Sequence, residues 1–225
     1  MILREFQTRA ELMTTLADAV AVCLDRAITA NGTASLAVPG GTTPGPFFDA
    51  LCGKDIEWSK VAITLGDERF VPEDSDRSNT RLIKERLLQN KASDARLIRL
   101  YQPANDPTEV LDDLEAGFDG ALPLTVNVLG MGADMHTASL FPDSNELSEA
   151  LTSKRILSVV RPASQPEARL TLTGQVLSGA QSIFVLITGE EKRAALMRAK
   201  GIADPMIAPI SLVLGLEQTE VFFAP

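Results

Sequence analysis

Four short apolar runs in this chain end in glycine, and the segments between them have helical periodicity. The runs are ASLAVPGG, VAITLGDE, LTVNVLGMG and SIFVLITG, which begin at residues 34, 61, 124 and 182. They are apolar at consecutive positions, which is typical of strands that are covered on both faces, as in parallel sheets. Strands that alternate with helices favour the same arrangement. The sequence therefore predicts an α/β fold with three layers, α/β/α, around a mostly parallel, Rossmann-like central sheet.

Helices are expected where apolar side chains recur at helical spacing, over residues 8–29, 44–52, 78–90, 107–120 and 190–200. Ser78 or Asn79 is the expected N-cap of the third. The first strand is expected near residue 34, weaker strand signals lie at 97–100 and 167–173, and the run at 220–224 is predicted to be an edge strand. No repeat or low-complexity linker divides the chain, which predicts a single domain over residues 1–225.

Charge and composition narrow the choice of partners. The chain has 225 residues and a formal net charge of −9, which argues against a nucleic-acid partner. A few local cations can still attract a small anion. No apolar run approaches the roughly 20 residues that a membrane helix requires, so no membrane partner is expected. Arg4 and Glu5 stand where a secretory signal would be apolar, and a cytoplasmic location is expected. The sequence indicates no oligomeric state.

Metal ligands are scarce in this sequence. His136 is the only histidine, and no CxxC pattern is present. Cys23 and Cys52 lie in apolar, helix-like patterns and are predicted to be reduced core residues. We therefore expect no transition-metal site.

Polar residues follow the four apolar runs, at 39–41, 66–68, 130–132 and 188–189. Ligands of open parallel sheets bind beyond the carboxyl ends of the strands. These segments are therefore expected to gather along one rim of the sheet and to form the binding site.

The first of these segments suits an anion. Gly40, Gly41, Thr42 and Thr43 precede Pro44, and proline is favoured at the first position of a helix. Backbone N–H groups at a helix N-terminus bind phosphate or an oxyanion. The segment lacks the GxxxxGK[ST] pattern of a P-loop, which argues against a nucleoside triphosphate. A tight turn capped by threonines is the competing interpretation.

Cations and a carboxylate accompany these loops. Lys192 lies in the first turn of a predicted helix, where a positive charge is unfavourable unless an anion is near. Arg169 lies in the run at 167–173, and its planar guanidinium can bind phosphate through two hydrogen bonds. Either residue could instead be a solvated surface cation. Asp67, Glu68 and Arg69 lie at a strand exit, where a carboxylate can act as an acid or base, or can hold the arginine.

His136 is the candidate general base. It follows a glycine-ended run, and Asp134, two residues earlier, could fix its tautomer. An unperturbed imidazole titrates near about 6.5, so a neutral fraction is available at cellular pH. The GxSxG pattern of a nucleophilic serine is absent, which leaves a water molecule as the expected nucleophile.

Five blocks, GGTTP, DERFVP, GMGADMHTASLFP, RLTLT and TGEEK, resemble the 6-phosphogluconolactonase family in order and context, over about residues 34–200. The family is similar in fold to glucosamine-6-phosphate deaminases. The resemblance implies hydrolysis of the δ-lactone of 6-phosphogluconate without a metal or other cofactor. It implies that His136 activates water beside Asp134 and that Arg69 orients the substrate. The implied substrate-binding residues are Gly40, Gly41, Thr42, Thr43, Asp67, Arg169 and Lys192, with the glycine–threonine loop and the last two holding the phosphate.

One position departs from the family pattern, and two other functions remain open. Family members usually read Asp-Gly-His, whereas Met135 precedes His136 here. If that residue has a positive φ, methionine incurs a steric cost, so either the backbone suits a side chain or the loop is altered.

Deaminases of this fold carry a glutamate five residues after the histidine, where this chain has Phe141, although Asp67 remains where a deaminase would use a base. The second alternative is a sugar-phosphate sensor, which the negative charge and the missing DNA-binding extension disfavour.

Overall fold

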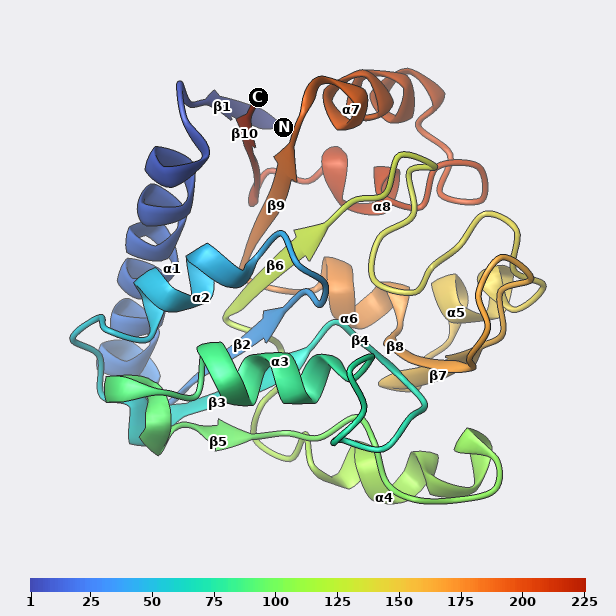
Figure 1. The fold of residues 1–225 in the computed structure, drawn as a ribbon, viewed down its shortest axis with the longest axis horizontal. Coiled ribbons are helices and arrows are strands. Elements are labelled where there is room, and N and C mark those ends of the chain that lie inside the picture. Colours follow the sequence, from blue (N-terminus) through green and yellow to red (C-terminus); the bar gives the residue numbers. More distant parts are fainter.

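The computed structural model describes all residues 1–225 and contains a seven-stranded sheet in which every neighbouring pair is parallel (Figure 1). In spatial order the strands are β1 (Ile2–Glu5), β10 (Thr219–Ala224), β9 (Ser182–Thr188), β6 (Val126–Gly130), β2 (Ala34–Val38), β3 (Val61–Leu65) and β5 (Arg96–Leu97). Every residue of β2 and β3 is buried, as their unbroken apolar sequences predict. The predicted α/β class and the mostly parallel sheet are confirmed.

Helices cover the sheet on both sides, with α1 and α2 to its left and α6 and α8 to its right in Figure 1. The helices are α1 (Arg9–Asn31), α2 (Gly45–Leu51), α3 (Asn79–Arg86), α4 (Leu111–Ala116), α5 (Leu147–Thr152), α6 (Gly174–Ser178), α7 (Glu190–Ile202) and α8 (Ser211–Leu214). The longest, α1, begins where the Thr8 side chain accepts a hydrogen bond from Glu11 N and ends at Gly32, whose φ is 82°. No helix combines the length and the apolar character that a bilayer crossing needs.

Two strand predictions are wrong: the position of the first strand and the edge position of the last one. The run at 220–224 is not an edge strand, because β10 lies between β1 and β9. The edge is β1, which pairs Ile2 with Glu220 and precedes the strand near residue 34 that was expected to be the first. Its four residues are mostly exposed and include Arg4 and Glu5, so they lack the apolar run by which the other strands were recognised.

A second, three-stranded antiparallel sheet accompanies the main one, and the sequence did not predict it. Its order is β4 (Asp67–Arg69), β8 (Arg169–Leu172) and β7 (Leu157–Val160). The register pairs Arg69 with Arg169 and Asp67 with Thr171. These short strands bring together two segments that are far apart in the sequence, and both carry predicted site residues.

Three predicted elements are clearly shorter in the structure. The helix expected over 107–120 is a 3-10 helix at Pro107–Val110 followed by α4, and the strand expected at 97–100 is the two-residue β5. The helix expected from residue 78 is α3, with Ser78 as the N-cap whose hydroxyl accepts a hydrogen bond from Arg81 N. Cys23 and Cys52 are free thiols; Cys52 is buried in the core, as predicted, whereas Cys23 is only half-buried against it.

Candidate active site

A pocket of about 230 Å³ opens at the carboxyl ends of the central strands. It is smaller than the roughly 300–1,000 Å³ of sites for drug-sized ligands, which suits a small polar molecule. All the predicted site residues except Asp134 line it. The segments at 39–41, 66–68 and 130–132 meet there, as expected. From the fourth run, Leu186 of β9 lines the pocket, and Lys192 of the following helix α7 joins it. Thr188, at the end of β9, faces a neighbouring groove that also contains Thr42 and Thr43.

His136 and Asp134 form a hydrogen-bonded pair at one wall of this pocket. Nδ1 of His136 lies 2.6 Å from Oδ1 of Asp134. An ionised carboxylate only accepts, so Nδ1 carries the proton and Nε2 is left with a lone pair. The hydrogen bond from His136 lowers the pKa of Asp134, against a smaller opposing effect of burial. The imidazole is 30% exposed, so ligand and water can reach it.

The loop that carries this pair is shaped by a glycine and a strained methionine. Gly132 N donates to His136 O at 3.0 Å, and Met135 N donates to Gly132 O at 3.0 Å. A Cβ on Gly132 would lie 2.3 Å from both Asp134 Oδ1 and His136 Nδ1, so only glycine fits there. Met135 has a φ of 69°. The loop thus keeps the left-handed backbone with a methionine in it, which costs about 1–2 kcal/mol.

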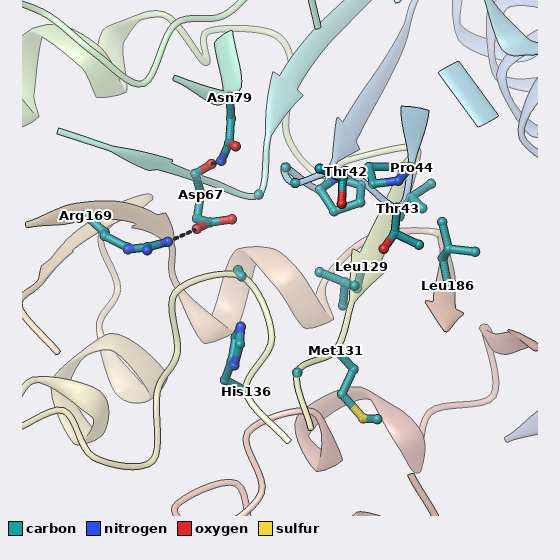
Figure 2. A pocket seen from close by; sticks show the side chains of 18 of the residues that line it. Thr42, Thr43, Pro44, Asp67, Asn79, Leu129, Met131, His136, Arg169 and Leu186 are labelled. Atoms are coloured by element: carbon teal, nitrogen blue, oxygen red, sulfur yellow. Dashed lines mark hydrogen bonds and ion pairs between the residues drawn. The ribbon is translucent and has the colours of Figure 1, made fainter. Parts of the chain in front are cut away.

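The glycine–threonine loop leads from β2 into α2. Gly41 has a φ of 85°, and a Cβ on Gly40 would lie 2.1 to 2.2 Å from the Asn79 side chain. Asn79 donates through Nδ2 to Asp67 O at 3.1 Å, so this amide ties β4 to the loop. Figure 2 shows Thr42, His136 and Asp67 reaching the same space from different sides.

Glu68 organises one wall of the pocket, a role that the sequence did not reveal. The side chain is fully buried and accepts hydrogen bonds from Asn79 N at 2.8 Å, Thr80 N at 2.6 Å and Arg69 N at 2.8 Å. Burial raises the pKa of Glu68, and these hydrogen bonds oppose that rise. Its place at the strand exit had marked Glu68 as a residue that could hold Arg69, but nothing in the sequence indicated that it would accept hydrogen bonds from three main-chain N–H groups.

Arg169 is buried rather than solvated. It is 5% exposed, and its Nη1 lies 3.6 Å from Oδ2 of Asp67 (Figure 2). Its Nη2 donates to Oε1 of Gln165 at 2.7 Å. Burial lowers the pKa of Arg169 most, Asp67 opposes that effect and the neighbouring Arg69 adds to it. Nε of Arg169 and Nε of Arg69 are buried without a hydrogen-bond partner. These two cations therefore have unused donors next to the pocket.

Lys192 occupies the first turn of α7 and lines the pocket. Burial lowers its pKa, and the negative charges of Glu191 and Asp134 act in the opposite direction. The positive end of a helix is unfavourable for an ammonium group, and partial burial adds to the cost of its charge. An anionic ligand would relieve it.

Two further residues complete the site and were not predicted to act there. Ser139 donates through Oγ to Oδ2 of Asp67 at 2.5 Å, which fixes the buried carboxylate. Phe141 stacks on the His136 ring with centroids 4.3 Å apart. Nothing in the residue type distinguishes this phenylalanine from an ordinary core residue. No group of three or more His, Cys, Asp or Glu side chains has the arrangement of a metal site.

Comparisons with known proteins agree on one family. The family model described as "Glucosamine-6-phosphate isomerases/6-phosphogluconolactonase" matches residues 7–223. A 6-phosphogluconolactonase of Mesorhizobium japonicum is 47% identical, covering 98% of this chain and 94% of its own, and one of Neisseria meningitidis is 39% identical, covering 98% and 97%. The crystal structure of a 6-phosphogluconolactonase from Shewanella baltica superposes with a TM-score of 0.92 at 36% identity, covering 100% of this chain and 97% of its own.

A glucosamine-6-phosphate deaminase described as monomeric also superposes, with a TM-score of 0.82, covering 100% of this chain and 97% of its own. Its sequence is 19% identical, so this likeness shows the shared fold alone. The family model matches nearly the whole chain, and the relatives match over nearly their full length. Both are stronger evidence of family membership than the likeness to this deaminase. The chain belongs to the glucosamine-6-phosphate isomerase/6-phosphogluconolactonase family.

Proposed function

We propose that the protein hydrolyses 6-phospho-D-glucono-1,5-lactone to 6-phospho-D-gluconate, a reaction of the oxidative pentose phosphate pathway. It is an enzyme of the carboxylic ester hydrolase class, as its curated relatives are by name. One observation carries the residue assignment: His136 shares its Nδ1 proton with Asp134, and its ring lines a pocket whose other walls supply Arg69, Arg169 and Lys192. A base and several cations around one small cavity suit an anionic ester.

The reaction begins with proton transfer to Nε2 of His136. A water molecule gives this proton to the imidazole as its oxygen bonds to C1 of the lactone, and the carbonyl electron pair moves onto the carbonyl oxygen. The negatively charged Asp134 stabilises the imidazolium that forms. When the carbonyl re-forms, the bond from C1 to the ring oxygen breaks, and the imidazolium returns its proton to that oxygen. The product is the open-chain acid, and His136 is regenerated.

Arg69 is the cation that orients the substrate and opposes the charge on the carbonyl oxygen. Its Nε is buried without a partner at the pocket wall, beside β8. A donor that is already desolvated and fixed costs little to reorganise when negative charge develops. Asp67, held by Ser139, offers its other carboxylate oxygen to the sugar hydroxyl groups.

The phosphate is held by the glycine–threonine loop together with Arg169 and Lys192. Burial lowers the pKa of both cations, so each is destabilised in the empty pocket and gains when a dianion binds. Gly40, Gly41, Thr42 and Thr43 add backbone and hydroxyl donors, which bind phosphate well.

The main rival is a deaminase or isomerase of glucosamine 6-phosphate. Asp67 is the only carboxylate among the residues that line the pocket. The position at which a deaminase has its glutamate holds Phe141, which is 2% exposed and has no acidic group. The carboxylate relay that opens the sugar ring in a deaminase would therefore lack its glutamate here. A sensor that binds sugar phosphate without turnover is the other rival.

The test is a lactone assay on purified protein, with the 6-phosphate present or absent from the substrate. We expect hydrolysis of the phosphorylated lactone well above its spontaneous opening. Without the phosphate, kcat/KM should fall about 10- to 150-fold for each charged hydrogen bond that the substrate no longer makes, since such bonds contribute roughly 1.5–3 kcal/mol. Ammonia release from glucosamine 6-phosphate would support the deaminase, and binding without any hydrolysis would support the sensor. Either result would refute the proposal.

A further inference from the structure

Phe141 contacts two functional side chains of the site without lining the pocket itself. It is 2% exposed, and its ring is nearly parallel to the His136 imidazole, with centroids 4.3 Å apart and 27° between the planes. The guanidinium carbon of Arg169 lies 5.4 Å from the same phenyl centroid. The candidate base and the buried cation thus share one aromatic neighbour that does not reach the ligand.

The hydrogen bond to Asp134 does not by itself fix the imidazole. It holds one nitrogen, but small coupled rotations about χ1 and χ2 can tilt the ring while Nδ1 stays within hydrogen-bond distance of Oδ1. Asp134 is also a poor anchor, because 52% of its side chain is exposed. A swing of the ring would turn Nε2 away from the pocket while the hydrogen bond survived.

Phe141 and Gly132 remove this freedom. The flat phenyl ring blocks one side of the imidazole, and stacked aromatic pairs contribute beyond the area they bury. The Gly132 main chain closes on the edge formed by Nδ1 and Cε1, where a Cβ would be within 2.3 to 2.4 Å of these atoms. With one edge and one face constrained, only a narrow range of directions is left for Nε2.

We propose that Phe141 is a positioning residue for His136: its stack keeps Nδ1 on Asp134 and Nε2 directed into the pocket. The same ring lies beneath the Arg169 guanidinium, so it holds the base and this cation at a set spacing. The inference rests on the proposed function, because it assumes that Nε2 accepts the proton of water. The fold places this aromatic ring where the related deaminases are expected to have a glutamate.

The experiment uses Phe141→Leu, which keeps an apolar side chain and removes the ring. Because His136 is the only histidine, the imidazole 15N and ring proton signals of the whole protein report on it alone. In the parent protein we expect the Nδ1–H tautomer. In Phe141→Leu we expect the ring-current shift to disappear and the nitrogen shifts to move toward a tautomer mixture. We also expect kcat to fall by up to about 100-fold, with a smaller change in KM.

Phe118→Leu is the matched control, since Phe118 is also 2% exposed but does not line the pocket or contact its base. It should leave both kcat and the imidazole signals unchanged. Phe141→Met, whose longer and more flexible side chain adapts better to an irregular gap, replaces the leucine variant if the latter does not fold. Phe141→Tyr keeps the ring and should restore the parent tautomer and most of kcat.

Two outcomes overturn the inference. One is a folded Phe141 variant without the ring that keeps the parent tautomer and kcat. The other is an equal loss of kcat in the Phe118 and Phe141 variants, which would reflect general packing. If the parent shows no lactonase activity, the proposed function fails, and the imidazole signals still decide whether Phe141 positions the ring.

Discussion

Nδ1 of His136 and Oδ1 of Asp134 lie 2.6 Å apart, and this hydrogen bond lowers the pKa of the carboxyl group. In Asp134→Asn the amide can still accept from Nδ1–H, but the negative charge that stabilises the imidazolium is absent. We expect kcat to fall by up to about 10,000-fold while KM changes little. Steady-state kinetics on the two proteins check this. An unchanged kcat would show that Asp134 plays no part in the reaction.

The same pair makes a prediction about stability at low pH. The pKa of Asp134 is lower in the folded protein than its ordinary value of 3.8, so the folded protein binds fewer protons than the unfolded chain in that range. Its contribution is fully present above about pH 4 and is lost as the pH falls through the lowered value. Urea unfolding between about pH 5 and pH 2.5 should therefore show a shallower decline for Asp134→Asn than for the parent.

Gly132→Ala should disturb the site without any change in its chemical groups. The added Cβ would lie 2.3 Å from the two atoms that form the Asp134–His136 hydrogen bond, so these side chains must leave their present positions. We expect a loss of kcat comparable to that of Asp134→Asn. Gly201→Ala in α7 is the control: nothing lies within 4 Å of its added Cβ, and alanine stabilises a helix by about 0.5–1 kcal/mol relative to glycine. Equal activity of the two variants would contradict the proposed steric role of Gly132.

Met135 tests whether the left-handed backbone or the side chain matters in the active-site loop. Its φ of 69° costs methionine about 1–2 kcal/mol, which glycine would not incur, but the methionine also packs on the core. We expect Met135→Gly to keep kcat and to change the free energy of unfolding by less than about 1 kcal/mol. Met135→Val should be clearly less stable, because a branched side chain tolerates this conformation worst. A valine variant as stable as the parent would show that the loop has another conformation.

Lys192 should contribute to affinity at the expense of stability. Its folded pKa is below the ordinary 10.5, so the unfolded chain binds more protons between the two values, and stability rises with pH across that window. At pH values below this window Lys192 is charged in the folded protein, and the free-energy cost of burying its charge is fully present. Lys192→Met should therefore resist urea better than the parent at about pH 7, with a smaller difference above about pH 10, while KM for the phosphorylated lactone increases.

Lys200→Met supplies the comparison for this prediction, since Lys200 is an exposed lysine in the same helix. It should leave KM and the urea midpoint close to those of the parent. If both variants raise KM equally, the effect belongs to the net charge of α7 and not to a contact with phosphate.

The central strands could be predicted because parallel strands buried on both faces must be apolar at every position, as in β2 and β3. The same physics predicted that the loops around Gly40, Asp67 and Gly130 would meet, since parallel strands place their carboxyl ends on one edge. A positive φ was named for position 135 only as a condition, and the structure fulfils it.

The missed features depend on contacts between distant segments. β1 is four residues long and mostly exposed, so only its pairing with β10 makes it a strand. A strand was expected at 167–173, but nothing local indicates that it pairs with β4, and this pairing decides that Arg169 is buried beside Asp67. Glu68 and Phe141 have ordinary residue types for a loop and a core, and their roles follow only from what surrounds them.

The most direct test of the central claim is the rate of lactone hydrolysis by His136→Asn, measured against the parent after subtraction of spontaneous opening. If Nε2 accepts the proton of the attacking water, kcat should fall about 100- to 10,000-fold. The affinity for 6-phosphogluconate and the urea midpoint should remain near those of the parent. A folded variant that hydrolyses the lactone at the parent rate would contradict the assignment of His136 as the base.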